Sequence, residues 1–184
     1  MTEGSFLNPA EALKAVQLYE GMQVADFGAG SGFFTREAAR EVGDGGAVWA
    51  VDLNRDLLPR IKTLATAEGL KNVEVVQGDV EVLGGSHLPD AQFDLVIAAN
   101  ILFALENKGE LVAEVRRVLK PGVGRALVID WAGSFGGLGP REDHLVTEEQ
   151  VHKLFEGHGF ASAGKVPAGA YHWGFLARKL ATRN

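Results

Sequence analysis

The chain contains no cysteine among its 184 residues, so it can form no disulfide, thiolate metal site or cysteine nucleophile. It is also short of basic residues: 18 Lys and Arg stand against 24 Asp and Glu, a net charge of −6, which argues against a nucleic-acid-binding surface. No apolar run approaches the roughly 20 residues of a membrane span. The first residues, MTEGSFLNP, lack a basic region followed by an apolar core, so no secretory signal is visible. We therefore expect a cytoplasmic protein with a small-molecule partner, as a monomer or a homodimer.

Neither an internal repeat nor a linker divides the sequence. The length suits one domain over residues 1–184. We divide it into an N-terminal segment (1–19), a core that binds the ligand (20–131) and a C-terminal part (132–184) with a loop, a helix and a hairpin. No histidines and carboxylates have the spacing of metal ligands, and we predict no metal site.

Short apolar runs alternate with segments of helical periodicity, which predicts an α/β fold with a parallel sheet covered by helices on both faces. The expected strands are 24–27, 47–51, 73–77, 93–99, 125–131, 160–166 and 171–178. The expected helices cover 8–19, 33–42, 54–68, a segment ending near 119, and 147–156, with Asn54 as the cap of the third. Only Pro167-Ala168-Gly169 separates the last two strands, so they should form a hairpin with an antiparallel last strand.

The segment VADFGAGSGFF, residues 24–34, reads as a strand, a glycine turn and a helix start. Glycine serves where the backbone needs a positive φ or where a ligand approaches it closely. The following helix N-terminus attracts a partly anionic ligand at the carboxyl edge of the sheet. The turn is GxGxG, because bulky Phe33 replaces the third glycine of a dinucleotide-binding turn, and no GK[ST] follows. A ligand without a pyrophosphate therefore fits better.

Three carboxylates stand at equivalent places: Asp26 in the first strand just before the glycine turn, Asp52 at the end of the second strand, and Asp79 after the third. Asp52 stands at the end of the second strand, where a carboxylate can accept both hydroxyls of a ribose. The alternative is that each aspartate only caps the next helix, as is common at strand ends. The glycine turn in the same register favours the ribose interpretation.

With these motifs in place, the sequence resembles the class I S-adenosylmethionine-dependent methyltransferases. The similarity is carried in order by VADFGAGSG, AVDLN, GDVEVL, FDLVIAANILFAL and RRVLKPGVGRALVID. Within that family, the sequence is most similar to the small-molecule branch that contains ubiquinone and menaquinone C-methyltransferases and arsenite methyltransferases. The resemblance implies a Rossmann-like, doubly wound, mostly parallel seven-stranded sheet, with the antiparallel seventh strand between the fifth and sixth. It also implies S-adenosylmethionine as cofactor and S-adenosylhomocysteine as product.

The resemblance assigns cofactor contacts to residues in all of these motifs. Asp26 would lie near the amino-acid end, Asp52 on the ribose, Asp79 with Val80 at the adenine, and Asn100 near the methionine portion. The complete expected set is Asp26, Gly28, Ala29, Gly30, Gly32, Asp52, Leu53, Gly78, Asp79, Val80 and Asn100. The sequence departs from the family's amino-methylating members, whose [DN]PP[YF] is here Asn100-Ile101-Leu102-Phe103, and it lacks the cysteines of arsenite methylation.

Methyl transfer needs a general base only when the acceptor must lose a proton. Our candidates for that catalytic role are His144, in the glycine-rich segment 132–146, and His172 at the start of the last strand. Each has the alternative of a plain loop or strand histidine. We further predict that the segment through Tyr19 and residues 132–146 form a mobile lid, and that Phe6, Phe103 and Trp131 line an apolar acceptor pocket.

Two rival functions stay open. A nicotinamide-dependent oxidoreductase is disfavoured by Phe33 and by the lack of a separate catalytic domain. A non-catalytic S-adenosylmethionine-binding subunit of a complex is compatible with the short chain. The basic residues Arg116, Arg117 and Lys120 are expected to form a solvated helix face.

Overall fold

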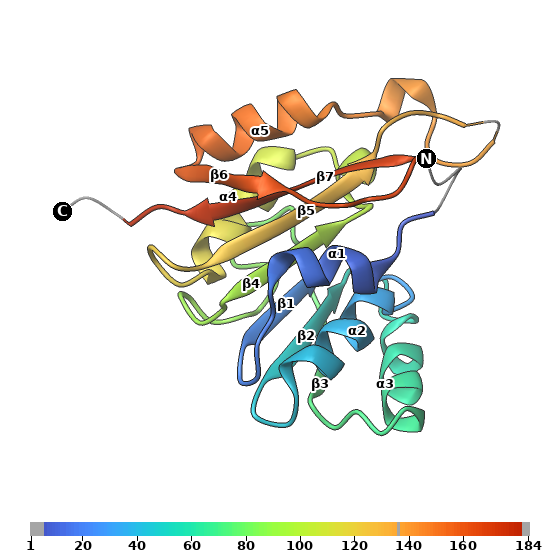
Figure 1. The fold of residues 1–184 in the computed structure, drawn as a ribbon, viewed down its shortest axis with the longest axis vertical. Coiled ribbons are helices and arrows are strands. Elements are labelled where there is room, and N and C mark those ends of the chain that lie inside the picture. The colour runs from blue at the N-terminus through green and yellow to red at the C-terminus, as the bar shows by residue number, and fades with distance from the viewer. Residues whose placement is uncertain (1–5, 136, 182–184) are drawn as a thin grey trace.

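The computed structural model describes residues 6–135 and 137–181, in which helices cover both faces of a seven-stranded sheet (Figure 1). The strands are β1 (Gln23–Phe27), β2 (Ala47–Asp52), β3 (Val73–Gln77), β4 (Leu95–Ala99), β5 (Arg125–Trp131), β6 (Phe160–Lys165) and β7 (His172–Lys179). The α-helices are α1 (Pro9–Val16), α2 (Phe33–Val42), α3 (Leu58–Ala67), α4 (Lys108–Val118) and α5 (Glu148–Gly157). Two short 3-10 helices, η1 (Leu102–Ala104) and η2 (Glu142–His144), complete the described chain.

The strand order is β3-β2-β1-β4-β5-β7-β6. Strands β1 to β5 pair in parallel, whereas β7 runs antiparallel to both β5 and β6. The predicted fold class is confirmed, including the antiparallel last strand between the fifth and the sixth. The chain order reverses between β1 and β4, and open α/β sheets bind ligands in the crevice at the carboxyl ends of strands at such a switch point.

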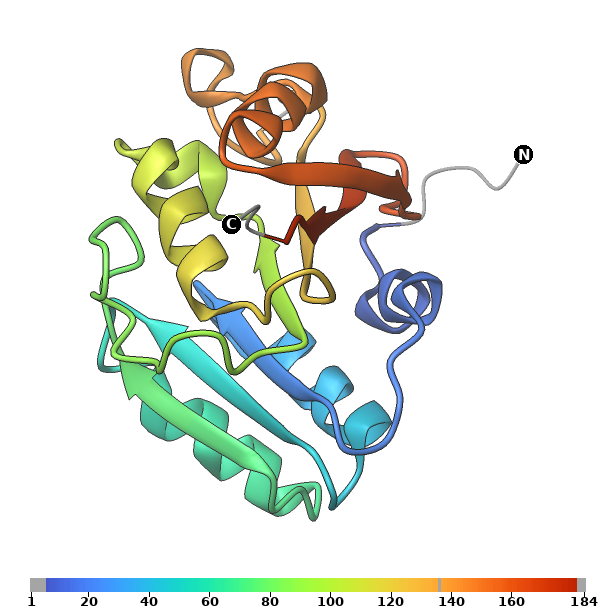
Figure 2. The ribbon, with the colours of Figure 1, turned by 90° about the vertical axis from the view of Figure 1, so that its left-hand side faces the viewer.

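Two apolar cores lie on the two faces of the sheet. Helices α1, α2 and α3 bury Leu13, Ala38 and Ile61 against one face. On the other face α4 and α5 bury Val115 and Phe155. Figure 2 shows the two groups of helices on opposite sides of the sheet. Because both faces are covered, the central strands are apolar almost throughout; four of five residues of β1 are buried.

Some element boundaries differ from the sequence-based expectation. Helix α1 ends at Val16 rather than near Tyr19, because Gln17 takes a left-handed backbone with φ 56°. Asn54 does not cap α3, which begins at Leu58; its side chain instead accepts a hydrogen bond from the Asp56 N–H in the preceding turn. None of the helices in the described part of the chain has the length and apolar character to span a bilayer.

Candidate functional site

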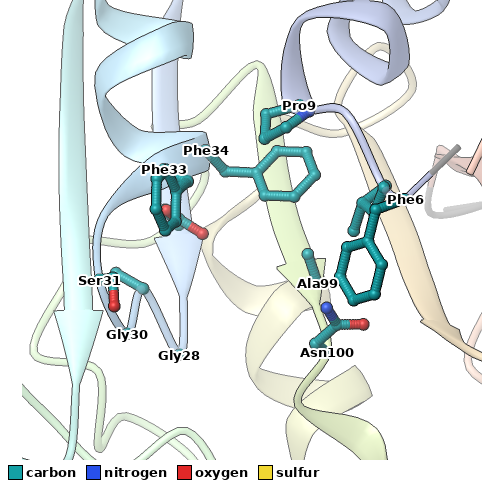
Figure 3. A pocket seen from close by; sticks show the side chains of 12 residues that line it. Phe6, Pro9, Gly28, Gly30, Ser31, Phe33, Phe34, Ala99 and Asn100 are labelled. Atoms are coloured by element: carbon teal, nitrogen blue, oxygen red, sulfur yellow. The ribbon is translucent and has the colours of Figure 1, made fainter. Parts of the chain in front are cut away.

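Two adjoining pockets open at the carboxyl ends of the parallel strands. The first has a volume of about 500 Å³ and the second about 290 Å³. Gly28 and Asn100, which follow β1 and β4, line both pockets and therefore mark their junction. Figure 3 shows the first pocket, with the glycine turn on one side and Phe6, Ala99 and Asn100 on the other. The junction lies at the switch point of the sheet, as the topology requires.

The expected cofactor residues divide between these pockets. The first pocket is lined by Asp26, Gly28, Ala29, Gly30 and Asn100 together with Phe6, Leu7, Pro9, Ser31, Phe33, Phe34 and Ala99. The second is lined by Gly28, Asp52, Leu53, Gly78, Asp79, Val80 and Asn100 together with Val51, Glu81, Ile101, Ala104 and Leu105. Residues from four of the five motifs thus meet around one continuous site, and the fifth, residues 116–130, lines neither pocket.

The glycine turn is held against the end of β2 by hydrogen bonds. The Gly28 N–H donates to the Val51 carbonyl oxygen at 2.8 Å, and the Gly30 N–H donates to Asp52 Oδ2 at 2.8 Å. Gly28 has φ +71°, and a Cβ there would overlap the side chain of Ile101. Gly30 has φ +54°, but a Cβ there would meet nothing nearer than the Gly28 carbonyl oxygen at 3.9 Å. Gly30 therefore presents bare backbone to the first pocket.

Gly32 lies outside the lining of both pockets, although we expected it to approach the cofactor. It occupies the N-cap of α2 with φ 72°. A Cβ there would come within 3.0 Å of the Ile61 side chain on α3. The third glycine of the turn is thus explained by helix entry and helix packing.

Asp26 reaches the first pocket from inside β1 and is only 2% exposed. Its Oδ2 accepts a hydrogen bond of 2.5 Å from Thr35 Oγ1, in the first turn of α2. Burial raises the pKa of the Asp26 carboxyl to about 6, while the hydrogen bonds from Thr35 oppose that rise. A cation bound beside Asp26 would stabilise the ionised carboxylate, and the ammonium group of an amino-acid ligand is such a cation.

Asp52 and Asp79 each use one oxygen to hold their own loop. Asp52 Oδ1 accepts from the Asn54 N–H at 2.9 Å, and Asp79 Oδ1 accepts from the Glu81 N–H at 2.9 Å. These bonds close the turns that follow the two strands and cap no helix, because α3 begins only at Leu58 and no helix of the described chain lies between β3 and β4. The helix-capping alternative is therefore wrong for both residues, and both line the second pocket. A carboxylate has about four acceptor sites, so each retains capacity for a ligand hydroxyl or amine.

Asn100 is the polar residue at the junction of the pockets. Its backbone is left-handed, with φ 55°, and its N–H donates to the Ile129 carbonyl oxygen at 2.9 Å. Its Oδ1 is buried and accepts no hydrogen bond from any residue that the structure describes. Such an oxygen is expensive to bury, so an unpaired one beside a pocket indicates a ligand contact.

Neither candidate catalytic histidine lines either of these two pockets. His144 is exposed in η2. His172 is 6% exposed and lies behind Phe6, with the two ring centroids 5.6 Å apart. Of the aromatic residues expected in the acceptor pocket, Phe6 lines it, whereas Phe103 and Trp131 do not. Within the described residues no group of three or more histidines and carboxylates could hold a metal ion.

Glu114 and Asp130 position the walls of the second pocket, and our sequence reasoning missed both. Glu114, on α4, is fully buried and accepts hydrogen bonds from the Gly84 and Ser86 N–H groups and from Arg117. Burial opposes its ionisation, but the hydrogen bonds prevail and lower the pKa of Glu114 to about 2. These contacts fasten the loop after β3 to α4. A charged residue at an apolar position of the α4 pattern was the available signal.

Asp130 plays the corresponding part at the end of β5. Its carboxylate accepts hydrogen bonds of 2.8 Å from the Leu102 and Trp131 N–H groups. Burial raises its pKa, against the backbone N–H groups that lower it. The residue therefore ties β5 to η1, whose neighbours Ile101 and Leu105 line the second pocket.

The basic face expected on α4 is wrong. Arg117 pairs with Glu114 and Asp90, and its side chain is only 18% exposed. Arg116 Nη1 donates to the Gly159 carbonyl oxygen at 3.0 Å, and Lys120 Nζ pairs with Asp94 at 2.6 Å. Arg116 and Arg117 thus join α4 to neighbouring loops, whereas Lys120 lies beyond the end of α4 and keeps a side chain that is 38% exposed.

Known proteins share both the motifs and this geometry. A family model described as a methyltransferase domain matches residues 18–158. A ubiquinone/menaquinone biosynthesis C-methyltransferase of Bordetella avium is 35% identical over 123 residues, which are 67% of this chain and 46% of the relative. The chain therefore spans about half the length of the curated relatives it matches.

Solved structures extend the likeness to almost the whole fold. A SAM-dependent methyltransferase from Aquifex aeolicus has 30% identity and a TM-score of 0.83, covering 94% of this chain and 89% of its own. A type 11 methyltransferase structure from Sulfolobus solfataricus, at 24% identity and a TM-score of 0.75, covers 98% and 96% and supports the fold alone. With the matching family model over residues 18–158 and four of its motifs gathered around one site, the chain belongs to the class I S-adenosylmethionine-dependent methyltransferase family.

Proposed function

We propose that this protein transfers a methyl group from S-adenosylmethionine to a small, largely apolar acceptor. The observation that carries the proposal is the pair of pockets joined at Gly28 and Asn100. The methionine end would occupy the first pocket, with its ammonium group at Asp26. The nucleoside would occupy the second, with the ribose on Asp52 and the adenine beside Asp79 and Val80. The sulfonium would then lie at the junction.

The reaction is an in-line displacement. An atom of the acceptor attacks the methyl carbon as the carbon–sulfur bond breaks, and the bond electrons neutralise the sulfonium to a thioether. Positioning and exclusion of water supply most of the acceleration. The unpaired Asn100 Oδ1 would be available at the junction as a partner for the positively polarised methyl group. Neither pocket is lined by a histidine that could take a proton from the acceptor. A proton that the acceptor loses would therefore pass to solvent.

The acceptor class follows from the lining of the first pocket. Phe6, Leu7, Pro9, Phe34 and Ala99 give it an apolar wall opposite Asp26. The names of the curated relatives refer to ubiquinone and menaquinone biosynthesis, which also involves apolar acceptors. We do not extend their acceptor to this chain, which covers less than half of the first of them. The cytoplasmic location, the oligomeric state and the single-domain organisation stay predictions.

Calorimetric titration with S-adenosylhomocysteine and with NAD tests the cofactor. We expect the thioether product to bind and NAD not to bind. Asp52→Ala should weaken binding of the product by about tenfold or more, because a charge-assisted hydrogen bond contributes roughly 1.5–3 kcal/mol. Asp56→Ala is the matched control, since Asp56 is exposed four residues further on. Binding of NAD alone would instead support the oxidoreductase.

Methyl transfer itself needs a separate assay. We would follow a labelled methyl group from S-adenosylmethionine into solvent-extractable products of an apolar metabolite mixture. Label in the organic phase, lost in Asp52→Ala and kept in Asp56→Ala, supports the enzyme. Tight binding of the cofactor without transfer to any acceptor would favour the non-catalytic subunit.

A further inference from the structure

His172 is a buried histidine that forms no hydrogen bond within the described chain. It begins β7, pairs with Trp131 at the end of β5, and is 6% exposed. Both ring nitrogens are shielded from solvent, and neither has a polar partner among the residues that the structure describes. Burial lowers the pKa of His172, so its ring is neutral, with one N–H donor and one acceptor lone pair. Leaving two such groups unpaired is costly, and the structure offers no compensation for it.

Aromatic rings surround this imidazole. The ring of Trp131 lies 4.3 Å away, centroid to centroid, and the ring of Phe6 lies 5.6 Å away, edge to face. Phe6 also contacts Trp131 and Tyr171, at 5.9 and 5.8 Å. The surroundings of His172 are therefore flat, mostly apolar aromatic rings.

Phe6 separates His172 from the first pocket. Its ring lines that pocket beside Ala99 and Asn100 (Figure 3), while it also covers the imidazole. Phe6 is nevertheless 50% exposed, so its contacts bury only part of the ring. A rotation of this one side chain would join the space around His172 to the pocket junction where the sulfonium is proposed to lie.

We infer that Phe6 covers an acceptor subsite in which His172 forms a hydrogen bond with a hydroxyl group of a flat, mostly apolar acceptor. The acceptor takes the place of the Phe6 ring against Trp131 and Tyr171, and its hydroxyl group pairs with the imidazole. The remainder of the acceptor then extends toward Asn100. This subsite rests on the proposed function for its place beside the methyl donor, but its hydrogen bond can be tested without methyl transfer.

Phenol and toluene are suitable probes, because they share a flat ring and differ in one hydroxyl group. Affinities would be measured by ligand-observed NMR, with and without S-adenosylhomocysteine. We expect the wild type to prefer phenol by about five- to tenfold, the usual effect of one net hydrogen bond. His172→Phe should lose this preference or favour toluene, because the phenol hydroxyl is then buried without a partner, and His172→Gln should recover part of the preference. Phe6→Ala should bind phenol more tightly, because no ring has to be displaced.

A direct readout separates this role from a structural one. In protein labelled with ¹⁵N at histidine, phenol should shift the NMR signals of the His172 ring nitrogens. Toluene should leave the chemical shifts of these nitrogens unchanged. Thermal unfolding identifies any variant that fails to fold, and His172→Leu, which also lacks a hydrogen-bonding group, then replaces His172→Phe in the comparison. Equal binding of the two probes by the wild type, or a preference that survives in folded His172→Phe, would overturn the inference. Failure to bind S-adenosylhomocysteine would refute the cofactor assignment instead, and the phenol preference without it would still decide the subsite.

Discussion

Asp26 is a residue that favours ligand binding but lowers the stability of the protein without ligand. Its carboxylate is buried under the first pocket, and its pKa is raised to about 6. The folded protein therefore holds a proton here that the unfolded chain, with an ordinary pKa of 3.8, releases earlier. At neutral pH the protein keeps an unfavourable buried charge, which the ammonium group of the proposed cofactor would compensate.

Asp26→Asn should stabilise the protein without ligand and weaken its binding of S-adenosylhomocysteine. The contribution of Asp26 to stability is present in full below about pH 4, falls as the pH rises to about 6 and stays low above it. The variant should remove this decline, raising the unfolding free energy at pH 7 by up to about 3 kcal/mol. Urea unfolding between pH 4 and pH 8 measures the unfolding free energy of the variant and of the wild type. Asp44→Asn, at an exposed position, is the control. A decline that persists in Asp26→Asn would contradict the assignment.

Gly30 allows a sharper distinction between strain and ligand contact. With φ +54° and open space around its missing Cβ, alanine should fit at a cost of about 1 kcal/mol of backbone strain. Valine should also fold, but its branched side chain would enter the first pocket and abolish binding of S-adenosylhomocysteine. Calorimetry and thermal unfolding on both variants check this. Normal cofactor binding by folded Gly30→Val would show that the turn is purely structural.

At the scale of elements, the loop after β3 is the part of the site most dependent on a distant helix. Gly78, Asp79, Val80 and Glu81 line the second pocket, yet the loop is anchored further on, where Gly84 and Ser86 donate to Glu114 of α4. Gly78 is required here, since a Cβ would come within 2.7 Å of the Gly85 carbonyl oxygen. The proposed adenine site is thus built by one loop and positioned by a buried ion pair.

Glu114→Gln should destabilise the protein and weaken its binding of the cofactor. In the folded protein the pKa of Glu114 is lowered from its ordinary value of 4.5 to about 2. The ionised Glu114 therefore stabilises the fold in full above about pH 4.5, and this stabilisation is lost as the pH falls toward 2. Removing the charge leaves Arg117 without its buried partner, and we expect a loss of about 3 kcal/mol at pH 7. Denaturant unfolding and calorimetry measure the two effects.

The control for this variant is Glu110→Gln, at an exposed position on the same helix. It should match the wild type in both stability and cofactor affinity. If Glu114→Gln loses stability but binds adenosine as the wild type does, Glu114 stabilises the fold without positioning the second pocket.

At the scale of the whole molecule, two segments far apart in sequence meet over one aromatic cluster. Phe6 precedes α1 and contacts Trp131 and Tyr171, while Phe135 of the 132–146 segment contacts Tyr171 at 4.8 Å. Gly139 packs on Trp131 so closely that a Cβ would come within 2.7 Å of its ring. The lid predicted from the sequence involves these segments, although its residues 1–5 and 136 lie outside the described residues.

Hydrogen exchange tests the lid on residues 6–19 and 137–146. Both segments should exchange faster than the strands without ligand, and should become protected when S-adenosylhomocysteine and an acceptor are bound together. The cofactor product alone should protect the glycine turn but affect the segment 137–146 less. Slow exchange already in the free protein, or no response to either ligand, would mean that this face is rigid.

Much of the fold could be predicted from the sequence alone, because local patterns carry it. Apolar runs of strand length alternate with helical periodicity, and the short link Pro167-Ala168-Gly169 permits only a hairpin. The glycine turn and Asp52 were also readable, since backbone conformation and strand-end position are encoded within a few residues. These features sufficed for the fold class and for the ligand-binding edge of the sheet, whereas the family and the expected cofactor residues were implied by the resemblance of the motifs.

Only the tertiary structure decided the roles that depend on contacts between distant segments. Gly32 packs on Ile61, Glu114 pairs with a loop some 30 residues earlier, and Asp130 holds η1. His172 is covered by the ring of Phe6, which lies near the opposite end of the sequence. A sequence pattern reports the residue type and its local geometry, but burial and partner choice are set by the packing of the complete fold. Whether an aspartate or a histidine closes a turn, joins two elements or contacts a ligand therefore depends on which groups the tertiary structure places next to it.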